Sequence, residues 1–492
     1  LKESTTKSHR DDTIRAGGFM CDQDIVSHRV SQATRQVDLL ERWGVIFRRD
    51  ADGIPLVRKA SGHTLPRLAG AGDSMVRGTQ QVLEEQCMKH GVVRRGDQVP
   101  LELVHSGEQI HGLIALDMTT GSLNALQAKS IIIADGGYEG IWTGSNVGLG
   151  LDLAMKAGLA VRDLEFVAWA PLAISGTNVV LPIGLLADGA TLHHSNGTPI
   201  DVELTADTTT LATAIGANSD AVLDARNMGE SSVWWAQTFE LVSQRLGIDM
   251  KKQTVPIHPR AATTIGGIAT DEHGRAVSGK WSRWFTGLYA AGDSACSGLH
   301  GAGLIAGNRL LDSMAGGAAA GEHAAGHAGK TSHTGRAALE IALGAVEADL
   351  DFDMAGAEEG PVQRAGPLFA TLENIMQTSM GYSRDAEGLG SALESLDALA
   401  ESAGKLHLDD SGRLFNTNLL EALRLKAGIR LAKATVQSAM SRTESRGTHQ
   451  RTDFTEQDDE QLHHTLVDID GNLSTLAIRK GTSGTWVLSP SE

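Results

Sequence analysis

Two apolar stretches in this chain each end in glycine, and they limit the folds open to it more than any other feature. Residues 129–140, KSIIIADGGYEG, run from three isoleucines into Gly136 and Gly137. Residues 287–312, GLYAAGDSACSGLHGAGLIAGNRLLD, begin like a strand and pass through Gly292 into a helix. A continuous apolar run is typical of a buried parallel strand, and glycine at its end lets a flat or anionic group come close. The two stretches predict an α/β domain with a ligand at the carboxyl ends of its strands.

A single large and flat cofactor suits both stretches. Small residues let the backbone approach a pyrophosphate or a fused ring, and the amides of the following helix face the negative charge. Asp293 follows the second strand and has the reach to accept a hydrogen bond from a ribose hydroxyl. Glycine turns after strands are also common without a cofactor, so a purely structural role is the alternative at this point.

Composition and charge exclude several other classes of protein. The 492 residues are enough for about two to four domains of roughly 100 to 200 residues each. The formal net charge of −17 opposes a nucleic-acid ligand, which needs a concentrated basic face. No uncharged apolar run of about 18 residues is present, so we expect membrane contact only through a partner. Cys21, Cys87 and Cys296 form no CxxC pair, which predicts free thiols in a reducing compartment and no cysteine metal site.

The character of the sequence changes along the chain. Residues 24–43 follow a helical apolar pattern that Gly44 ends, and residues 74–90 form a second predicted helix. Strands are predicted at GLIALDM, KSIIIADGG and RDLEFVAWAPL, with a helix at GLGLDLAMKAG before the last of these. From Ser175 to Asp249 short strands alternate with turns rich in Thr, Gly and Asn. Residues 336–445 are helix-like almost throughout, and the tail alternates like a small sheet.

Several segments of the chain occur in a characteristic order: IIIADGGYEG, GLDLAMKAGLAVRDLEFV, IGGIATDEHG, GLYAAGDSACSGLHGAGLIAGNRLLD and ESRGTHQRTDFTEQDDE followed by HHTL. In that order they resemble the flavoprotein subunit of succinate dehydrogenase and fumarate reductase, whose superfamily includes L-aspartate oxidase. The first hundred residues resemble the same family in HRDDTIRAGGFMCDQDIVSHRV, ERWGVIFRRDADG and SGHTLPRLAGAGDS. The resemblance covers nearly the whole chain.

The resemblance implies an α/β plus α fold with a discontinuous, Rossmann-like FAD-binding domain. That domain would comprise residues 1–168 and 263–330, with an α+β capping domain inserted at 169–262, a helical domain at 331–445 and a small C-terminal domain at 446–492. Family members have an N-terminal βαβ unit with a GxGxxG turn, and many carry a histidine linked covalently to the flavin. Neither is present in these residues, so we expect a chain truncated upstream of Leu1, with the βαβ unit missing from its first domain.

FAD is the cofactor that the resemblance implies, and part of its binding site carries over. Asp293 stands where the family has a glutamate, and Arg309 and Leu310 stand where it has a serine and a leucine whose backbone lies against the flavin ring. Leu149 replaces a family aspartate, so that contact is lost, and Asp152 is not an obvious substitute. The predicted cofactor-binding residues are Gly136, Gly137, Gly292, Asp293, Arg309 and Leu310, and no metal site is predicted.

The family's substrate site is replaced in this chain. The family adds or removes two hydrogens across a dicarboxylate carbon–carbon bond, and such a substrate needs converging cations and hydrogen-bond donors. Here Leu304 replaces the carboxylate-binding arginine, and the general-acid arginine is absent because residues 163–225 contain no Arg or Lys. The other replacements are Ala170 and Ala262 for two histidines and Leu172 for a threonine.

Four other residues are the candidates to replace them, and the predicted catalytic residues are His300, His258, Arg260 and Arg309. Each has a structural alternative. His258 suits a surface position at a strand end, Arg260 a domain-interface ion pair, and His300 a satisfied buried histidine. Arg309 alternatively complements the charge of a reduced flavin. His193 and His194 on the cap are further hydrogen-bond donors.

Three remaining features have structural interpretations as well. The ESRGTHQR segment packs internally or contacts an electron-accepting subunit. The Trp234–Trp235 pair is most simply core or interface, and Glu165 is a buried structural partner rather than an orienting acid.

The sequence leaves three functions open. The first is the flavoprotein subunit of a succinate dehydrogenase or fumarate reductase type complex, with hydride transfer to or from a carboxylate substrate and electron transfer to an iron–sulfur subunit. The second is an FAD-dependent oxidoreductase of the superfamily with a different, less anionic substrate. The third is a degenerate subunit that holds FAD or a partner without turnover. For the first we expect a cytoplasmic protein, peripheral on the inner face of the membrane through its partner subunits.

Overall fold

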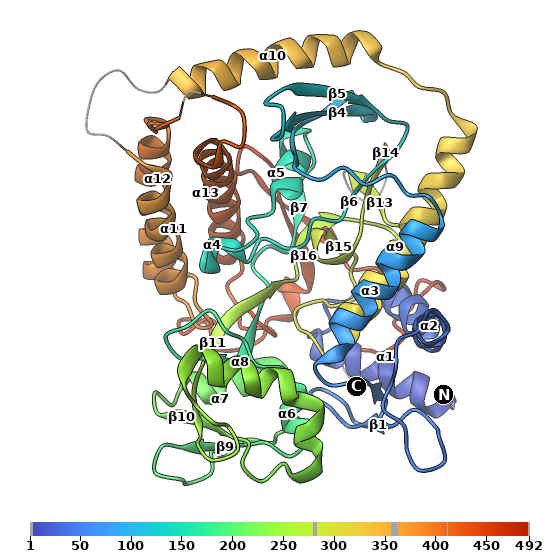
Figure 1. Ribbon diagram of the computed structural model, residues 1–492, viewed down its shortest axis with the longest axis vertical. Coiled ribbons are helices and arrows are strands. Elements are labelled where there is room, and N and C mark those ends of the chain that lie inside the picture. Colours follow the sequence, from blue (N-terminus) through green and yellow to red (C-terminus); the bar gives the residue numbers. More distant parts are fainter. Residues whose placement is uncertain (1–2, 279–282, 356–362, 411, 491–492) are drawn as a thin grey trace.

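The computed structural model describes residues 3–278, 283–355, 363–410 and 412–490. β-Sheets occupy the centre of the molecule, a group of helices lies on the left, α1 to α3 and α9 lie on the right, and a smaller lobe lies below (Figure 1). In the part of the chain that is described, no helix is both long enough and apolar enough to cross a membrane.

The two glycine-ended strands are neighbours in a six-stranded sheet. β6 (Ile131–Ile133) and β14 (Arg283–Ala290) pair in parallel, with Ile133 opposite Ala290. Parallel strands present their carboxyl ends at one edge, so the glycines that follow them meet there. The other strands of this sheet are β3 (Gln98–Ser106), β4 (Gln109–Asp117), β5 (Leu123–Gln127) and β13 (Arg275–Ser278).

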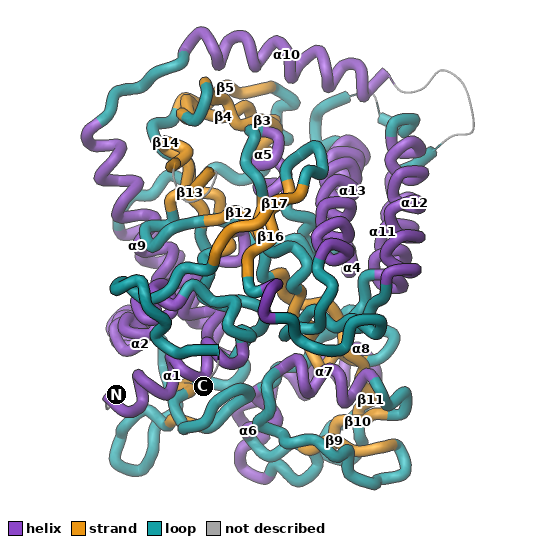
Figure 2. The backbone as a smooth tube through the Cα atoms, turned by 180° about the vertical axis from the view of Figure 1, so that it is seen from behind, coloured by secondary structure: helices purple, strands orange, loops and turns teal. Residues whose placement is uncertain are grey.

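A five-stranded sheet joins distant parts of the chain. β7 (Val161–Arg162) lies between β12 (Gly267–Ala269) and β16 (His463–Val467), and the remaining strands are β15 (Ala295–Cys296) and β17 (Leu473–Ala477). Seen from behind, β16 and β17 cross the middle of the molecule (Figure 2). The β16–β17 hairpin agrees with the small sheet predicted for the tail.

The lower lobe of Figure 1 is built on a four-stranded sheet in the order β8-β11-β10-β9. Its strands are β8 (Val167–Ile174), β9 (Thr191–His194), β10 (Ala221–Asp224) and β11 (Val255–Thr264), and its helices are α6 (Gly184–Ala187), α7 (Thr208–Gly216) and α8 (Ala236–Leu246). Buried side chains between Leu172 and Ile257 form their own hydrophobic cluster. We call this lobe the cap. The predicted domain boundaries stay predictions.

Helices surround these sheets. On the right are α1 (Glu3–Ala16), α2 (Gln23–Trp43), α3 (Ser74–Lys89) and α9 (Asn308–Lys330), and the hairpin β1 (Val57–Arg58) with β2 (Leu68–Ala69) lies below them. α4 (Gly140–Thr143) and α5 (Leu149–Lys156) follow β6. The helical group on the left comprises α11 (Ala365–Ser379), α12 (Ala386–Ala403) and α13 (Thr417–Ser441). α10 (Arg336–Ala355) runs across the top of Figure 1 and packs on β3, β4 and β5. The helix predicted at 24–43 is confirmed as α2, which ends at Gly44 with φ 112°.

The single strand predicted over RDLEFVAWAPL was wrong. The segment forms the end of β7 and the start of β8, which belong to different sheets. Asp163 separates them with φ 58°, a left-handed conformation that a strand does not contain. Its carboxylate accepts hydrogen bonds from the Thr465 N–H at 3.0 Å and from His464 Nδ1 at 2.7 Å. Residues of the C-terminal region therefore stabilise a turn that the local sequence does not predict.

Candidate cofactor and substrate site

The ends of β6 and β14 form a surface of small residues. Ser294 Oγ accepts a hydrogen bond from the Gly136 N–H at 3.0 Å, which ties the two strand ends together. A side chain at Gly137 would overlap Thr264 and Glu139 and would touch the Cβ of Asp293. The structure thus brings Gly136, Gly137 and Asp293 together, as predicted from their strand positions.

The N-terminus of α9 points to the same place. Gly307 precedes the helix with φ 88° and provides no side-chain cap. The Asn308 N–H donates to Ile305 O at 3.3 Å, so the N–H groups that follow in the first turn are the ones that can face an anion. Arg309 in the first turn donates from Nε to Asp293 Oδ2 at 2.6 Å. Asp293 is 11% exposed and Arg309 50% exposed, so the carboxylate that we assigned to a ribose hydroxyl already has a cationic partner. Sequence reasoning missed this pair because the two residues are 16 positions apart.

Glu139 is a further acid at this site that the sequence did not reveal. Burial raises the pKa of its carboxyl group. Its Oε2 is buried and has no hydrogen-bond partner among the described residues. A raised pKa and an unpaired oxygen beside Gly137 are typical of a group that meets a ligand.

The loop that joins β15 to α9 is held by backbone hydrogen bonds and packs too closely against Gly447 for a side chain to fit there. The Ala302 N–H donates to Gly17 O at 2.9 Å, and the Thr448 N–H donates to Ala302 O at 2.7 Å. A Cβ on Gly447, which has φ 53°, would overlap that same carbonyl group. The predicted internal packing of ESRGTHQR is confirmed for its central residues, because Glu444, Arg446 and His449 are all at most 1% exposed.

His300 lies in this loop, and its side chain is 12% exposed. Burial lowers the pKa of its imidazole, so the neutral form is favoured. Its Nε2 is 3.7 Å from Asp312 Oδ2, and its Nδ1 has no partner among the described residues. The described chain therefore leaves Nδ1 of His300 without a partner, and the role of this histidine stays a prediction.

His258 and Arg260 lie elsewhere, on the face of β11 turned toward the helical group. The His258 ring lies edge-on to Tyr382 at 6.4 Å, and Arg260 Nη1 donates to Thr177 O at 3.1 Å. Among the described residues, the hydrogen bonds, ion pairs and ring contacts of this pair do not include His300 or Arg309. The structure therefore divides the four predicted catalytic residues into two groups, and their roles stay predictions.

Four other sequence candidates have evident structural positions. His193 and His194 lie on β9, where His194 contacts Asp220 at 3.0 Å, at the far end of the cap in Figure 1. Asp152 is bound through both oxygens by Arg430 at 2.7 Å, so it does not replace the lost aspartate. Glu165 accepts from Arg442 Nε at 2.7 Å in the interior.

The cap meets the FAD-binding region along a seam of three loops. The Gly62 N–H donates to Thr205 O at 2.9 Å, and Ser61 Oγ donates to Ala206 O at 2.5 Å. Thr208 Oγ1 reaches Leu304 O at 3.4 Å, and the Leu304 side chain packs on the apolar cluster that includes Phe166. We define the seam as residues 61–64, 205–208 and 304–306. It contains no arginine or lysine.

Asp188 fastens the cap at a second point. Its carboxylate accepts from Trp235 Nε1 and Arg48 Nη1, each at 2.7 Å, and contacts Arg58 as well. Trp234 carries the Arg48 guanidinium over its ring at 4.6 Å. The predicted core or interface role of the two tryptophans is confirmed.

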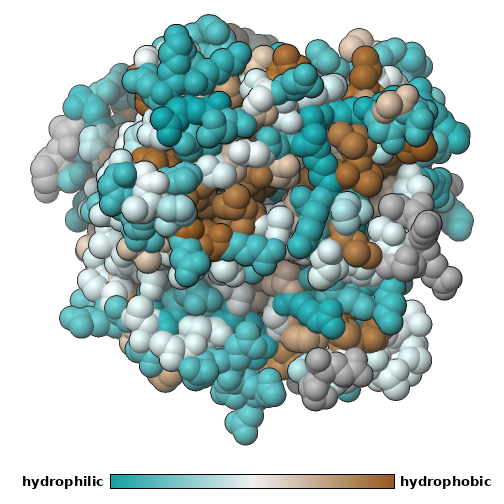
Figure 3. Space-filling model, turned by 90° about the horizontal axis from the view of Figure 1, so that it is seen from below, coloured by the Kyte–Doolittle hydropathy of each residue, from teal (hydrophilic) through white to brown (hydrophobic). Residues whose placement is uncertain are grey.

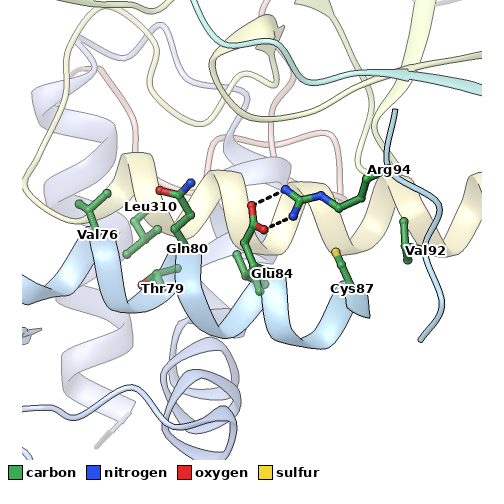
Figure 4. A pocket seen from close by; sticks show the side chains of 9 residues that line it. Val76, Thr79, Gln80, Glu84, Cys87, Val92, Arg94 and Leu310 are labelled. Carbon is green, nitrogen blue, oxygen red and sulfur yellow. Dashed lines mark hydrogen bonds and ion pairs between the residues drawn. The ribbon is translucent and has the colours of Figure 1, made fainter. Parts of the chain in front are cut away.

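An open groove of about 360 Å³ adjoins the N-terminus of α9. Leu310 lies at one end, and α3 supplies most of the wall through Val76, Thr79, Gln80, Leu83, Glu84 and Cys87 (Figure 4). Glu84 and Arg94 pair across the other end. Leu310, predicted to contact the flavin, therefore borders an accessible apolar surface. Seen from below, the molecule also shows apolar patches within a largely polar surface (Figure 3).

These features fit the flavin end of FAD. The strand end at Gly136 carries no side chain and has a φ of 92°, and an uncapped helix N-terminus suits an anion. His300 Nδ1 and Glu139 Oε2 are buried polar atoms without protein partners, as a ligand site requires. No cluster of His, Cys, Asp and Glu arranged for a metal ion occurs among the residues described.

Comparisons with known proteins agree with this assignment. Residues 1–310 match the FAD binding domain family, and residues 370–489 match the fumarate reductase flavoprotein C-terminal family. The fumarate reductase flavoprotein subunit of Mycobacterium tuberculosis H37Rv is 30% identical over 96% of this chain and 86% of its own length. That of Escherichia coli K12 is 29% identical over 94% and 82%.

Solved structures show the same relationship. An E. coli quinol fumarate reductase FrdA variant superposes with a TM-score of 0.90 and 26% identity over 100% of this chain and 89% of that one. Adenylylsulfate reductase from Archaeoglobus fulgidus has the same fold, with a TM-score of 0.72 and 16% identity over 98% and 87%. This chain is an FAD-dependent oxidoreductase and belongs to the family of fumarate reductase and succinate dehydrogenase flavoprotein subunits.

Proposed function

We propose that this chain oxidises or reduces a substrate bound in the seam between the cap and the FAD-binding domain, and that this substrate is less anionic than a dicarboxylate. The observation that carries the proposal is the absence of any arginine or lysine from the seam. Two carboxylates in a dry site need cationic partners, because burying an unpaired charge is costly. Of the two arginines beside the seam, Arg309 is paired with Asp293, and Arg67 pairs with Asp12 through one nitrogen only.

FAD, when bound, supplies the acceptor or donor of hydride. The residues of this chain bind and orient it: the strand ends at Gly136 and Gly137 lie beside it, and the first turn of α9 faces its negative charge. His300 is neutral at physiological pH, because burial lowers its pKa, and its free Nδ1 is suited to accept a proton from a ligand hydroxyl or N–H. The seam loops close the site to water through the contacts of Gly62 and Ser61 with the cap.

Anaerobic reduction of the flavin tests the substrate class. The full chain is loaded with FAD and mixed with succinate or with a panel of uncharged carbonyl and steroid-like compounds, and bleaching of the flavin absorbance is followed. We expect an uncharged compound to bleach the flavin and succinate to leave it oxidised. Bleaching by succinate at an equal or higher rate would contradict the proposal. If dithionite alone reduces the flavin, the degenerate, non-catalytic function is correct.

A matched pair of variants tests the site assignment. His300→Gln removes the buried imidazole, and we expect the rate of flavin reduction to fall by about 100-fold or more, as for loss of a general acid or base. His194→Gln changes an exposed cap histidine and is the control, with an unchanged rate. Equal rates for both variants would remove His300 from the site.

We further propose an iron–sulfur subunit as the electron acceptor, and a peripheral membrane position through such partners. Support comes from the relatives, which are named as subunits of fumarate reductases. Co-expression with a neighbouring reading frame that contains clustered cysteines should yield a complex that survives gel filtration. A chain that stays monomeric with that product would favour a free-standing enzyme.

A further inference from the structure

A buried arginine beside the N-terminus of α9 lacks acceptors for two of its three guanidinium nitrogens. The Arg67 side chain is 3% exposed, and its Nη1 lies 2.6 Å from Asp12 Oδ2. Nε and Nη2 are buried and have no partner among the described residues. A buried donor left unpaired costs about 1–3 kcal/mol, and more when it is charged. The edge of the guanidinium formed by Nε and Nη2 therefore needs a hydrogen-bond acceptor, and the described residues provide none.

The free edge has the geometry of an oxyanion receptor. Nε and Nη2 are the two donors with which arginine binds a carboxylate or phosphate through parallel hydrogen bonds. Asp12 occupies the opposite side of the guanidinium and is itself fixed by the Thr64 N–H at 2.9 Å and Thr64 Oγ1 at 3.0 Å. The arginine is thus held in place with its bidentate edge unoccupied.

His63 provides a second unpaired atom in the same place. It is 4% exposed, and its Nε2 is 2.9 Å from Ala306 O, so Nε2 carries a proton and donates it. In the neutral ring Nδ1 is then a bare acceptor, and it has no partner among the residues described. Arg67 is near enough to contribute to lowering the pKa of this imidazole.

The start of α9 adds a favourable field. Leu68, which follows Arg67, fills the space beside Gly307, the residue that precedes the helix. His9 joins the same group through Asn308 Oδ1 at 2.6 Å. The N-terminus of a helix of 23 residues carries a partial positive charge that stabilises a nearby anion.

We propose that Arg67 and His63 form a buried oxyanion site at the N-terminal end of α9, which takes a carboxylate or phosphate group. Two sources share this chemistry, a phosphate of FAD and a carboxylate of a ligand other than the substrate. The site is independent of the proposed function, because its occupation is measured without turnover.

The charge balance makes binding depend on pH. Arg67 and Asp12 neutralise each other, so an added anion leaves one negative charge in the interior. Burial and Arg67 hold the pKa of His63 at about 4 in the absence of an anion, with His9, Asp12 and Arg67 as the ionisable neighbours. An anion beside the ring raises that pKa, so binding takes up a proton and strengthens as the pH falls from 8 toward 5.

Sulfate is the probe, because it does not change its charge in this range. Titration calorimetry on the full chain, with chloride at equal ionic strength as the reference, should give saturable binding. We expect Arg67→Lys, which keeps the charge but loses the bidentate edge, to weaken binding at least tenfold. Arg364→Lys alters a matched arginine on the surface, paired with Asp409, and should leave the affinity unchanged.

His63→Gln separates the anion site from a general effect on folding. The amide still donates to Ala306 O, so binding at pH 8 should stay within a few-fold of the parent chain, while the gain toward pH 5 and the proton uptake disappear. If Arg67→Lys does not fold, this variant decides the question. Unchanged pH dependence in His63→Gln, unchanged affinity in folded Arg67→Lys, or no saturable binding by the parent chain would each overturn the proposal.

FAD distinguishes the two sources. Competition between FAD and sulfate assigns the site to a phosphate of the cofactor. Binding of sulfate alongside saturating FAD assigns it to a carboxylate. The flavin-reduction assay tests the proposed substrate class, and sulfate binding tests the oxyanion site. A negative result in one assay therefore does not contradict the other proposal.

Discussion

Asp22 is the centre of a buried charge network that stabilises the cofactor loop, and its replacement by Asn should be costly. The Asp22 carboxylate lies 3.0 Å from Arg162 Nη1 and 3.3 Å from His464 Nε2, and none of the three side chains is exposed. Its Oδ1 also accepts from the Arg479 N–H at 2.7 Å. The Asp22 N–H donates to Gly298 O, so the network extends into the loop that precedes α9.

The magnitude follows from the titration of this group. Burial opposes the charge on Asp22, but His464 and Arg162 outweigh it and hold the pKa at about 2. The pKa of an aspartate in an unfolded chain is about 3.9. The lower pKa of Asp22 in the folded chain therefore corresponds to about 2.5 kcal/mol of folding free energy at neutral pH. Because the folded pKa is lowered, that contribution is complete above about pH 4 and is lost as the pH falls toward 2.

Asp22→Asn should therefore reduce the free energy of unfolding by about 3–5 kcal/mol at pH 7, since it also leaves Arg162 and His464 buried beside a neutral amide. Urea unfolding followed by circular dichroism measures the loss. The difference from the parent chain should narrow between pH 4 and pH 2, where the parent loses the same contribution.

Asp24→Asn is the matched control. Asp24 lies two residues along in the same helix, is 24% exposed and pairs with Arg479 at 3.0 Å. Burial raises the pKa of Asp24, so its negative charge does not stabilise the folded chain as that of Asp22 does, and this variant should be nearly neutral. A loss below about 1 kcal/mol for Asp22→Asn, or equal losses for the two variants, would refute the reasoning.

Three further predictions use simple measurements. Gly447→Ala places a Cβ against Ala302 O at a backbone φ of 53°, so we expect a loss of about 2 kcal/mol or more and a lower flavin content per purified chain; parent-like flavin content would show that the loop has another support. Asp188→Asn removes the charge that holds Arg48 and Arg58, so protease should cleave the cap faster while the α13 region stays protected, and an unchanged digestion pattern would count against the tether. Of the three cysteines, Cys87 alone should react with a disulfide reagent in the folded chain, and all three should react after unfolding. Cys21 and Cys296 are buried, and burial raises the pKa of Cys296 to about 12. More than one reactive thiol in the folded chain would contradict this prediction.

The sequence predicts those parts of the fold that depend on local patterns. β6 and β14 are continuous apolar runs, and α2 is an apolar stripe ended by a glycine, so each is predictable from its own residues. The turn at Asp163 is not, because the groups that stabilise it, His464 and Thr465, lie 301 and 302 positions away.

The candidate site divides in the same way. Gly136 and Gly292 are at strand ends, which a sequence shows directly. The Arg309–Asp293 pair and the free edge of Arg67 depend on side chains that only the folded chain brings together or leaves apart. The sequence does not show whether the charge of a basic side chain is already neutralised by an acidic partner. That pairing decides which ligands the site can bind.

The position of β7 has a consequence for synthesis of the chain. β7 pairs with β16, and the Thr465 N–H bonds to Asp163, 302 residues before it. At about 5–20 residues per second, a ribosome needs roughly 15–60 s to make that stretch. Throughout this time the nascent chain exposes an unpaired strand edge and the charges that belong beside it. We expect this chain to depend on chaperones during translation, and C-terminal deletions that remove β16 to leave most of it insoluble even though its cap is complete.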